Sequence, residues 1–374
     1  MKTLSPSLRQ PKASIRPENE LMFCCARVQV EPQTSQRIQA LIQQNLDWQA
    51  VIQLAYRHGV MPLLYKNLHA ISPQAMPGAD FEQLRHLFKA NTQRSLLLAG
   101  ELVKILTLFN QHQIAAVPYK GPVLANAVYG GVAFRQYFDL DIVVQQQDVL
   151  PAKLLLIEQG YIPKDKMNEL EEEAFLQSRD EHNYTLIHTD KRIAVELHWR
   201  ITPRSTSVIE PKHFWERLEP DLFAGTQIAN LSLEEWLPIL CVHGSRHRWE
   251  RLTWLCDIAE IMRLRPELDW DAVIARSQIL VCQRMLFLGV LLAHRLLDAP
   301  LPIAILQRMQ THSEVVTLVN STYQQLLSET KVSDQFLGKT IYQIRVSDRF
   351  QERAIYLQSF LQWLINPDKR VVHH

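Results

Sequence analysis

The chain has 374 residues, of which 47% are hydrophobic and 21% are charged. This composition is that of a globular protein with a sizeable core, and it excludes a disordered, collagenous or coiled-coil chain. Lys and Arg total 40 against 39 Asp and Glu, a formal net charge of +1, so charge favours neither nucleic-acid wrapping nor binding to an anionic membrane. Only 11 residues are glycine, less than half the usual share of ~7%, which favours a mostly helical chain.

Neither a signal peptide nor a membrane span is expected. The N-terminal segment MKTLSPSLRQPKASIRPENE carries charge and proline but no apolar stretch. The most apolar run, MLFLGVLLA at 285–293, is too short to cross a bilayer. The five cysteines form no CxxC pair, so neither a disulfide framework nor a zinc ribbon is predicted. These features together favour a cytoplasmic protein.

The N-terminal third of the chain has helical periodicity. Residues 1 to about 30 have the composition of a loosely held tail, and apolar residues then recur at helical spacing over 36–69, with a break at Gly59. After the turn cluster SPQAMPGAD, a long amphipathic helix is predicted over 81–110. We therefore expect an N-terminal tail and helical module over residues 1–112.

The periodicity changes between residues 113 and 203. The apolar run IAAVPYK at 114–120 predicts a buried strand, and DLDIVV at 139–144 predicts another, with the short helix PVLANAVY between them. A helix over 148–159 follows, and the segments YTLIH and IAVELHW then predict a hairpin over 184–199. This part of the chain should form a small α/β core.

Beyond residue 203 the helical period returns and continues to the end of the chain. Residues 204–374 are therefore predicted to form a C-terminal helical module. The expected fold is α+β and mostly helical, with a small core flanked by N- and C-terminal helical modules.

Two carboxylates lie close together on one predicted strand. Asp139 and Asp141 are two residues apart, so in a strand they project from the same face, roughly 6.5 to 7 Å apart, while their neighbours face the core. Like charges at this distance repel each other and need a cation. Mg²⁺ is the natural partner, because this hard cation takes carboxylate oxygens and keeps positions open for phosphate.

A third carboxylate, Glu196, lies in the predicted strand IAVELHW. It shares one strand face with His198, whereas the alternate residues are apolar. If this strand lies beside that of Asp139 and Asp141, the three carboxylates can hold two metal ions about 3.5 to 4 Å apart. His198 is then placed to hydrogen-bond to a ligating carboxylate.

Glycine and basic residues precede the two aspartates. Three of the 11 glycines, beginning with Gly121, fall in one short stretch, which marks backbone that bends tightly or approaches a ligand closely. Lys120 and Arg135 are candidates for contacts to phosphate, Arg135 by a bidentate contact. The alternatives are a solvated lysine at a strand end, and a structural salt bridge from Arg135 to one of the two aspartates.

A pair of histidines lies in the predicted C-terminal helices. His243 and His247 have the i, i+4 spacing of the HExxH zinc proteases, but Gly244 replaces the general-base glutamate, so protease chemistry is not supported. Two interpretations remain. The pair is either one partly buried helix face, or it lines, with Arg251, the cleft between the helical module and the core and contacts acceptor or phosphate.

The rest of the sequence gives no sign of another kind of catalytic site. No GxxxxGKS, GxSxG or GxGxxG motif is present, which excludes the common kinase, hydrolase and dehydrogenase classes. No catalytic role is expected for Cys24 and Cys25. Three tryptophans of the C-terminal part are expected in the core rather than as base-stacking groups; these are Trp249, Trp254 and Trp270.

At these residues the chain resembles the nucleotidyltransferase superfamily, and more closely a group of bacterial proteins known as uncharacterised nucleotidyltransferases. The resemblance covers most of the chain and is carried by KG at 120–121, Arg135, DLDIVV at 139–144, ELHW at 196–199, HGVMPLLY at 58–65 and CVHGSRHRWERLTWLCDIAEI from Cys241.

The resemblance implies a small mixed-sheet nucleotidyltransferase core over 113–203. In that core Asp139 and Asp141 bind two metal ions, and Glu196 binds the one that activates the acceptor. One residue departs from the superfamily: its phosphate-holding turn usually has Gly followed by Ser, whereas here Pro122 follows the glycine and offers neither a hydroxyl nor a backbone N–H.

The expected function is metal-dependent transfer of a nucleoside monophosphate from a nucleoside triphosphate, such as ATP, to an unknown acceptor with release of pyrophosphate. Two Mg²⁺ or Mn²⁺ ions are the expected cofactors. A small molecule, peptide or saccharide precursor fits the near-zero charge better than a nucleic-acid acceptor. The alternatives are a catalytically silent binding or regulatory protein with this fold, and a metal-dependent enzyme acting on another phosphorylated small molecule.

The candidate residues divide into two sets. The expected catalytic and metal-binding residues are Asp139, Asp141 and Glu196. The expected nucleotide-binding residues are Lys120, Gly121, Arg135, His198, His243 and His247.

Overall fold

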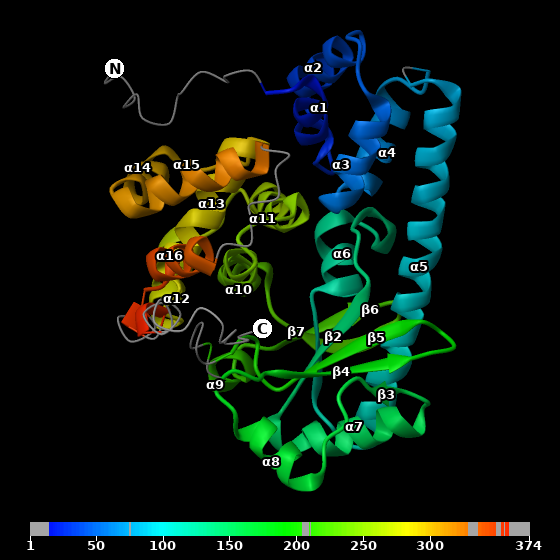
Figure 1. Ribbon diagram of the computed structural model, residues 1–374, viewed down its shortest axis with the longest axis vertical. Helices are drawn as coiled ribbons and strands as arrows, with labels where there is room; N and C mark the ends of the chain where they lie inside the picture. Colours follow the sequence, from blue (N-terminus) through cyan, green and yellow to red (C-terminus); the bar gives the residue numbers. More distant parts are fainter. Residues whose placement is uncertain are drawn as a thin grey trace.

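The fold is α+β and mostly helical, as the sequence predicts, with a small mixed sheet. In Figure 1 the sheet lies at the lower end of the molecule, the N-terminal helices at the upper end and the C-terminal helices along one side. The computed structural model describes residues 15–74, 76–203, 209, 211–327, 336–348, 353–354 and 356–358.

Four short helices begin the described chain. The expectation of a tail up to residue 30 is wrong for residues 17–25, which form a helix with Leu21 and Met22 fully buried. Pro17 begins this helix at a position where its missing N–H has no helical partner to lose. Residues 1–14 lie outside the described ranges. The four helices are α1 (Pro17–Cys25), α2 (Pro32–Ile42), α3 (Trp48–Arg57) and α4 (Met61–Ile71).

The long helix α5 (Gly78–Gln111) connects the N-terminal helices to the sheet. Its 34 residues give a length of about 50 Å at 1.5 Å per residue, and Figure 1 shows it running from the N-terminal helices at the upper end down to the sheet. Apolar residues of its C-terminal half, among them Leu102 and Phe109, are buried in the hydrophobic core beneath the sheet. This helix therefore fixes the sheet relative to the helical end of the protein.

The sheet has five strands in the order β1-β2-β5-β4-β3. Strands β2 and β5 are parallel, and the other neighbours are antiparallel. The sequence-based predictions of the strand over 139–144 and of the hairpin over 184–199 are confirmed. The strands are β1 (Ala116–Tyr119), β2 (Asp139–Val144), β3 (Ile162–Pro163), β4 (Asn183–His188) and β5 (Ile193–His198).

The two faces of the sheet differ in polarity. Leu140 and Ile142 of β2 and Val195 and Leu197 of β5 face the core under the sheet and are fully buried. Since side chains alternate along a strand, the residues between them point to the opposite face. The remaining elements of this region are α6 (Gly121–Tyr129), α7 (Val149–Glu158), α8 (Glu169–Gln177) and the short 3-10 turns Val132–Phe134 and Gln146–Asp148.

A second, two-stranded sheet lies just after the core. Residues 204–374 were expected to be helical, but β6 (Glu219–Phe223) and β7 (Thr226–Asn230) form an antiparallel hairpin. The hairpin turns at Ala224 and Gly225, both with positive φ, as the favoured two-residue hairpin turn requires. Phe223 is buried in the same core as the five-stranded sheet, so this hairpin extends the α/β region beyond residue 203.

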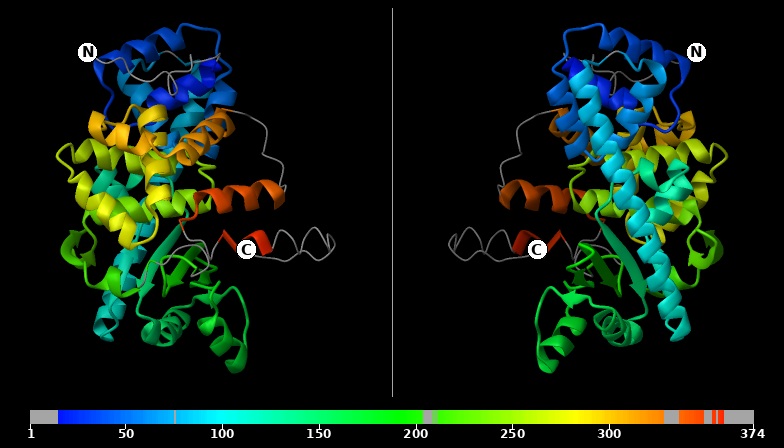
Figure 2. Two further views of the ribbon diagram at one scale, coloured as in Figure 1. Left: turned by 90° about the vertical axis from the view of Figure 1, so that its left-hand side faces the viewer. Right: turned by 90° about the vertical axis from the view of Figure 1, so that its right-hand side faces the viewer.

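The C-terminal helices share one hydrophobic core with the N-terminal helices. Both views of Figure 2 show the C-terminal helices between the N-terminal helices and the sheet. No helix in the described part of the chain combines the length and apolar character needed to cross a membrane. The helices are α9 (Pro211–Trp215), α10 (Leu233–Arg246), α11 (Leu252–Leu264), α12 (Trp270–Ile279), α13 (Gln283–Leu297), α14 (Ile303–Gln310), α15 (Ser313–Leu327) and α16 (Phe336–Val346).

Packing explains the glycine that follows His243 in α10. The indole of Trp249 is fully buried and lies directly against Gly244. A Cβ atom at Gly244 would lie 2.2 Å from the Trp249 ring, far inside van der Waals contact. The glycine is therefore needed for the close approach of the tryptophan.

Candidate active site

A cavity of about 600 Å³ lies between the polar face of the sheet and the helices α10 and α11. Its walls come from segments far apart in the sequence, the core strands on one side and the C-terminal module on the other. All the candidate residues of the sequence analysis line this one cavity: Lys120, Gly121, Arg135, Asp139, Asp141, Glu196, His198, His243 and His247.

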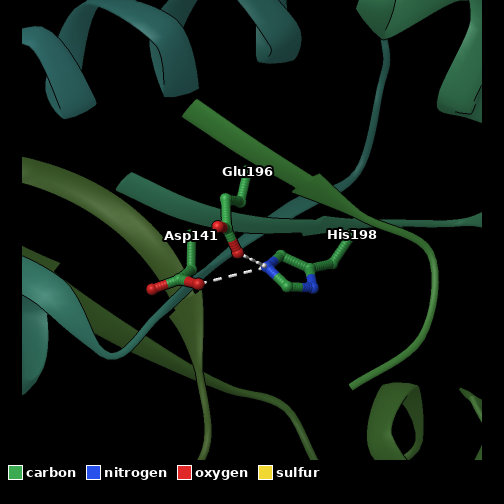
Figure 3. A group of neighbouring side chains, drawn as sticks. All are labelled: Asp141, Glu196 and His198. Carbon is green, nitrogen blue, oxygen red and sulfur yellow. Dashed lines mark hydrogen bonds and ion pairs between the residues drawn. The ribbon is translucent and has the colours of Figure 1, made fainter. Parts of the chain in front are cut away.

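The acidic side chains of the cavity come from two parallel neighbouring strands. Asp141 of β2 lies directly opposite Glu196 of β5 in the strand register. Together with His198, they form a group whose candidate ligand atoms all lie within 4.8 Å of one another, and Figure 3 shows the three side chains pointing toward a common centre. Asp139 lines the same cavity but does not belong to this group.

Hydrogen bonds hold the group together. The Nε2 atom of His198 lies 3.1 Å from Oδ1 of Asp141 and 3.3 Å from Oε2 of Glu196. Asn183 of the adjacent strand β4 donates from Nδ2 to Oε2 of Glu196 at 2.9 Å. Burial lowers the pKa of His198, but the two carboxylates outweigh burial and raise it above its usual value. The imidazole thus bridges the two carboxylates in this structure.

The two aspartates of β2 have opposite pKa shifts. Burial, and next the charge of Asp141, raise the pKa of Asp139 to about 6. Burial would also raise the pKa of Asp141, but Lys120 and the hydrogen bond from His198 outweigh it and lower that pKa to about 2. Asp141 is therefore held in its charged form by neighbouring groups of the protein, whereas Lys120 only partly offsets the effects that disfavour the charge of Asp139, and an added cation would stabilise that charge.

The turn between β1 and α6 presents Lys120 to the carboxylates. Its Nζ atom lies 3.5 Å from Oδ1 of Asp141 and 4.4 Å from the centre of the Tyr119 ring. The side chain is 12% exposed, so it is not a solvated lysine at a strand end. Its φ of 58° and ψ of −130° form a rare conformation for a residue with a Cβ, and such strain persists only where the surrounding structure enforces it.

Residues after Lys120 begin a helix at the cavity. Gly121 has a φ of +47° and is the first residue of α6, with Pro122 next to it in the first turn. The first backbone N–H groups of a helix have no partner within the helix. Pro122 therefore costs the helix nothing by lacking an N–H, although the contact that serine makes in the wider superfamily has no counterpart at this residue.

Arg135 pairs with an acid that the sequence analysis did not consider. Its Nε and Nη2 atoms donate to Oδ1 and Oδ2 of Asp257 on α11 at 2.8 and 2.9 Å. The phenol of Tyr129 donates to Oδ1 of the same carboxylate at 2.6 Å. Arg135 and Asp257 are 5% and 1% exposed. The alternative of a salt bridge to Asp139 or Asp141 is therefore wrong, and the bidentate contact predicted for phosphate is made to Asp257, in a buried pair between the core and the C-terminal module.

Three aromatic rings form part of the opposite wall. The rings of His243 and His247 lie 5.4 and 5.1 Å from that of Trp254, centre to centre. Burial lowers the pKa of His243 well below its usual value, so this imidazole is neutral. Trp249 and Trp270 are buried in the core as expected, but Trp254 lines the cavity. The interpretation of the histidines as cavity-lining residues agrees with their position.

Several lining residues were missed by the sequence analysis. Asn183 and Thr185 alternate with the buried Tyr184 and Leu186 along β4, a period-two pattern that could have marked them. Arg246 lies three residues after His243 on α10 and lines the same cavity, as helical spacing allows. His182 just before β4 also lines it, and no sequence pattern indicates this.

The fold and the cavity together define a class. A small mixed sheet with carboxylates on adjacent strands, facing basic side chains across a polar cavity, has the chemical groups of a metal-dependent enzyme acting on phosphate esters. A family model of uncharacterised nucleotidyltransferases matches residues 44–298, a range that includes the entire cavity lining. The chain belongs to this family. Neither a comparison with curated proteins nor one with solved structures gives a match.

Proposed function

We propose that this protein is a metal-dependent nucleotidyltransferase that transfers a nucleoside monophosphate from a nucleoside triphosphate to an acceptor and releases pyrophosphate. The observation that carries the proposal is the cluster of Asp141, Glu196 and His198, with ligand atoms within 4.8 Å. This cluster lies on the sheet face of a cavity that also holds Lys120 and Arg135. Family membership supports the same reaction class.

The donor atoms of the site fit a divalent metal. Carboxylate oxygens of Asp139, Asp141 and Glu196 are ligands that Mg²⁺ and Mn²⁺ prefer, and the raised pKa of Asp139 indicates a carboxylate that lacks a compensating cation. These three residues would hold up to two ions. When bound, such ions polarise phosphoryl oxygens and lower the pKa of the attacking group. His198, hydrogen-bonded to two of the carboxylates, would orient them.

The residues of the cavity have distinct tasks in the proposed reaction. An acceptor oxygen donates an electron pair to the α-phosphorus, the bond from this phosphorus to the bridging oxygen breaks, and pyrophosphate leaves with that electron pair. The acceptor proton passes to water. Lys120 and the turn at Gly121 would bind phosphate oxygens, and His243 and His247 would contact the nucleotide or the acceptor. Catalysis consists of positioning and charge stabilisation.

Two other functions fit parts of the same site. A catalytically silent binding protein would bind nucleotide without releasing pyrophosphate, and an enzyme acting on another phosphorylated small molecule would show no preference for triphosphates.

For the acceptor we propose a small molecule, a peptide or a saccharide precursor, because the formal charge of +1 gives little attraction to a nucleic acid. A cytoplasmic location is supported by the five cysteines, none of which forms a disulfide.

Thermal unfolding with nucleotides tests the proposal. With Mg²⁺, one or more of the four nucleoside triphosphates at 100 times its dissociation constant should stabilise the protein by about 2.7 kcal/mol. The stabilisation should be smaller without Mg²⁺ and smaller in Asp139→Asn, because both changes remove a partner of the triphosphate. The measurement is the unfolding midpoint by differential scanning fluorimetry, followed by pyrophosphate release for each nucleotide that shifts it.

The matched control is Asp190→Asn, which changes an exposed aspartate in the turn between β4 and β5. This variant should respond to nucleotides as the unchanged protein does. Nucleotide binding without pyrophosphate release, whatever acceptor mixture is supplied, would favour the silent binding protein. The absence of any nucleotide-dependent shift would contradict the proposal.

Metal binding should depend on pH. Asp139 has a pKa of about 6 in the metal-free protein and must lose its proton to bind a cation. The affinity for Mn²⁺ should therefore fall as the pH is lowered through 6, and each ion bound near this pH should release protons. Calorimetric titrations with Mn²⁺ at pH 5.5 and 7.5 measure the affinity. Repeating each titration in two buffers of different ionisation enthalpy measures the number of protons released. An affinity independent of pH over this range would exclude Asp139 as a ligand.

A further inference from the structure

The basic residues of the cavity differ in how their charges are balanced. Lys120 lies beside Asp141, and Arg135 forms its bidentate pair with Asp257. For Arg246, in contrast, no acidic side chain lies within ion-pair distance in the part of the chain that the structure describes. Arg251 also lacks such a partner there, but its side chain is exposed and water can solvate it.

The charge of Arg246 is left without full compensation. Burial lowers the pKa of Arg246, and the opposing effects of Tyr119, Tyr356 and Glu196 do not offset it. For Lys120 and Arg135 the neighbouring carboxylates outweigh burial and raise the pKa. A guanidinium stays protonated in proteins, and buried charges are normally paired. Within the described part of the chain, Arg246 is therefore a cation without an acidic partner, and an anionic ligand in the cavity can supply its counter-charge.

The position of Arg246 indicates what this counter-charge is. It belongs to the helix face of α10 that carries His243, and it lines the cavity whose other wall holds the carboxylates of β2 and β5. A ligand that fills this cavity meets metal-binding groups at the sheet and a free guanidinium at α10. A metal-bound polyphosphate has the matching charges, because oxygens near the sheet coordinate the metal and the distal phosphates remain anionic.

We propose that Arg246 binds the β- and γ-phosphates of the nucleoside triphosphate, the part that leaves as pyrophosphate. This inference rests on the proposed function and adds a residue of the C-terminal helical module to the substrate site. The planar guanidinium can donate two parallel hydrogen bonds to phosphate oxygens. As the bond to the α-phosphorus breaks, negative charge gathers on the departing pyrophosphate, and Arg246 stabilises that charge.

The test compares ligands that contain or lack the distal phosphates. Inorganic pyrophosphate with Mg²⁺ is the first probe, and nucleoside triphosphate and monophosphate with Mg²⁺ are the second and third, all titrated calorimetrically. Arg246→Gln should weaken the binding of pyrophosphate and of triphosphate roughly 10- to 100-fold, the effect of one charge-assisted hydrogen-bonding group. It should leave the affinity for monophosphate unchanged, and Arg246→Lys should restore part of the loss.

A second measurement separates binding from a structural role. Because the half-buried side chain of Arg246 has no acidic partner among the described residues, Arg246→Gln should not lower the unfolding midpoint of the ligand-free protein. A residue needed for folding would lower this midpoint and the affinities for all three ligands together. Arg57→Gln, at an exposed arginine of α3 that is not part of the cavity lining, is the control and should change neither quantity.

The outcomes distinguish the inference from the proposed function. If the unchanged protein binds triphosphate and pyrophosphate and Arg246→Gln binds them equally well, the role of Arg246 is refuted while the proposed function stands. An equal loss for monophosphate would also refute it, because Arg246 would then contact the α-phosphate or the nucleoside. If the unchanged protein binds neither ligand with Mg²⁺, both proposals fail.

Discussion

Replacing Asp139 or Asp141 by Asn should lower the rate of nucleotidyl transfer roughly 1,000-fold. Asparagine keeps the shape of the side chain but loses the charge that holds a divalent ion, and such an ion supplies several kcal/mol of transition-state stabilisation. Each 1.36 kcal/mol corresponds to a factor of ten in rate. The measurement is pyrophosphate release from the nucleotide identified by thermal unfolding, with a small-molecule extract as the source of acceptor.

The two variants should differ in stability although both lose activity. The folded protein disfavours the charge of Asp139 and favours that of Asp141, as their pKa shifts to about 6 and about 2 show. At pH 7 without metal, Asp139→Asn should therefore raise the unfolding midpoint, whereas Asp141→Asn should lower it by removing the partner of Lys120 and His198. Full activity in either variant would exclude that aspartate from the metal site.

The acidic face of the sheet could be predicted because its pattern is local. In DLDIVV and in ELHW, polar residues alternate with apolar ones, and this period of two assigns each side chain to a face before any strand pairing is known. The structure places Asp141 and Glu196 opposite each other. From the sequence, this arrangement followed only if the two strands were neighbours in the sheet. The pairing itself depends on contacts between residues far apart in the chain.

The elements that were missed lack such a pattern. In β6 only Phe223 is buried and its other residues are exposed, so no alternation distinguishes this strand from a loop. In α1 the apolar residues Leu21, Met22 and Phe23 are consecutive, which hides the helical period. The partner of Arg135 lies 122 positions away, and one sequence contains no signal that connects two charges over this distance.

Removal of the buried carboxylate of Asp257 should cost about 3–5 kcal/mol of the free energy of unfolding. The variant Asp257→Ala leaves the guanidinium of Arg135 buried without a partner and deprives the Tyr129 phenol of its acceptor. Urea denaturation followed by circular dichroism measures the loss. Asp271→Ala is the matched control, because the ion pair of Asp271 with Arg308 is exposed and should contribute less than about 1 kcal/mol.

The double variant Arg135→Met with Asp257→Leu decides the origin of that loss. If the cost in Asp257→Ala comes from the uncompensated charge of Arg135, removing both charges should restore much of the stability, because apolar residues of similar volume can replace a buried pair. The same double variant removes a basic group from the cavity wall, so it should fold but bind triphosphate more weakly. A double variant as unstable as Asp257→Ala would show instead that the hydrogen-bonded pair itself joins the core to α11.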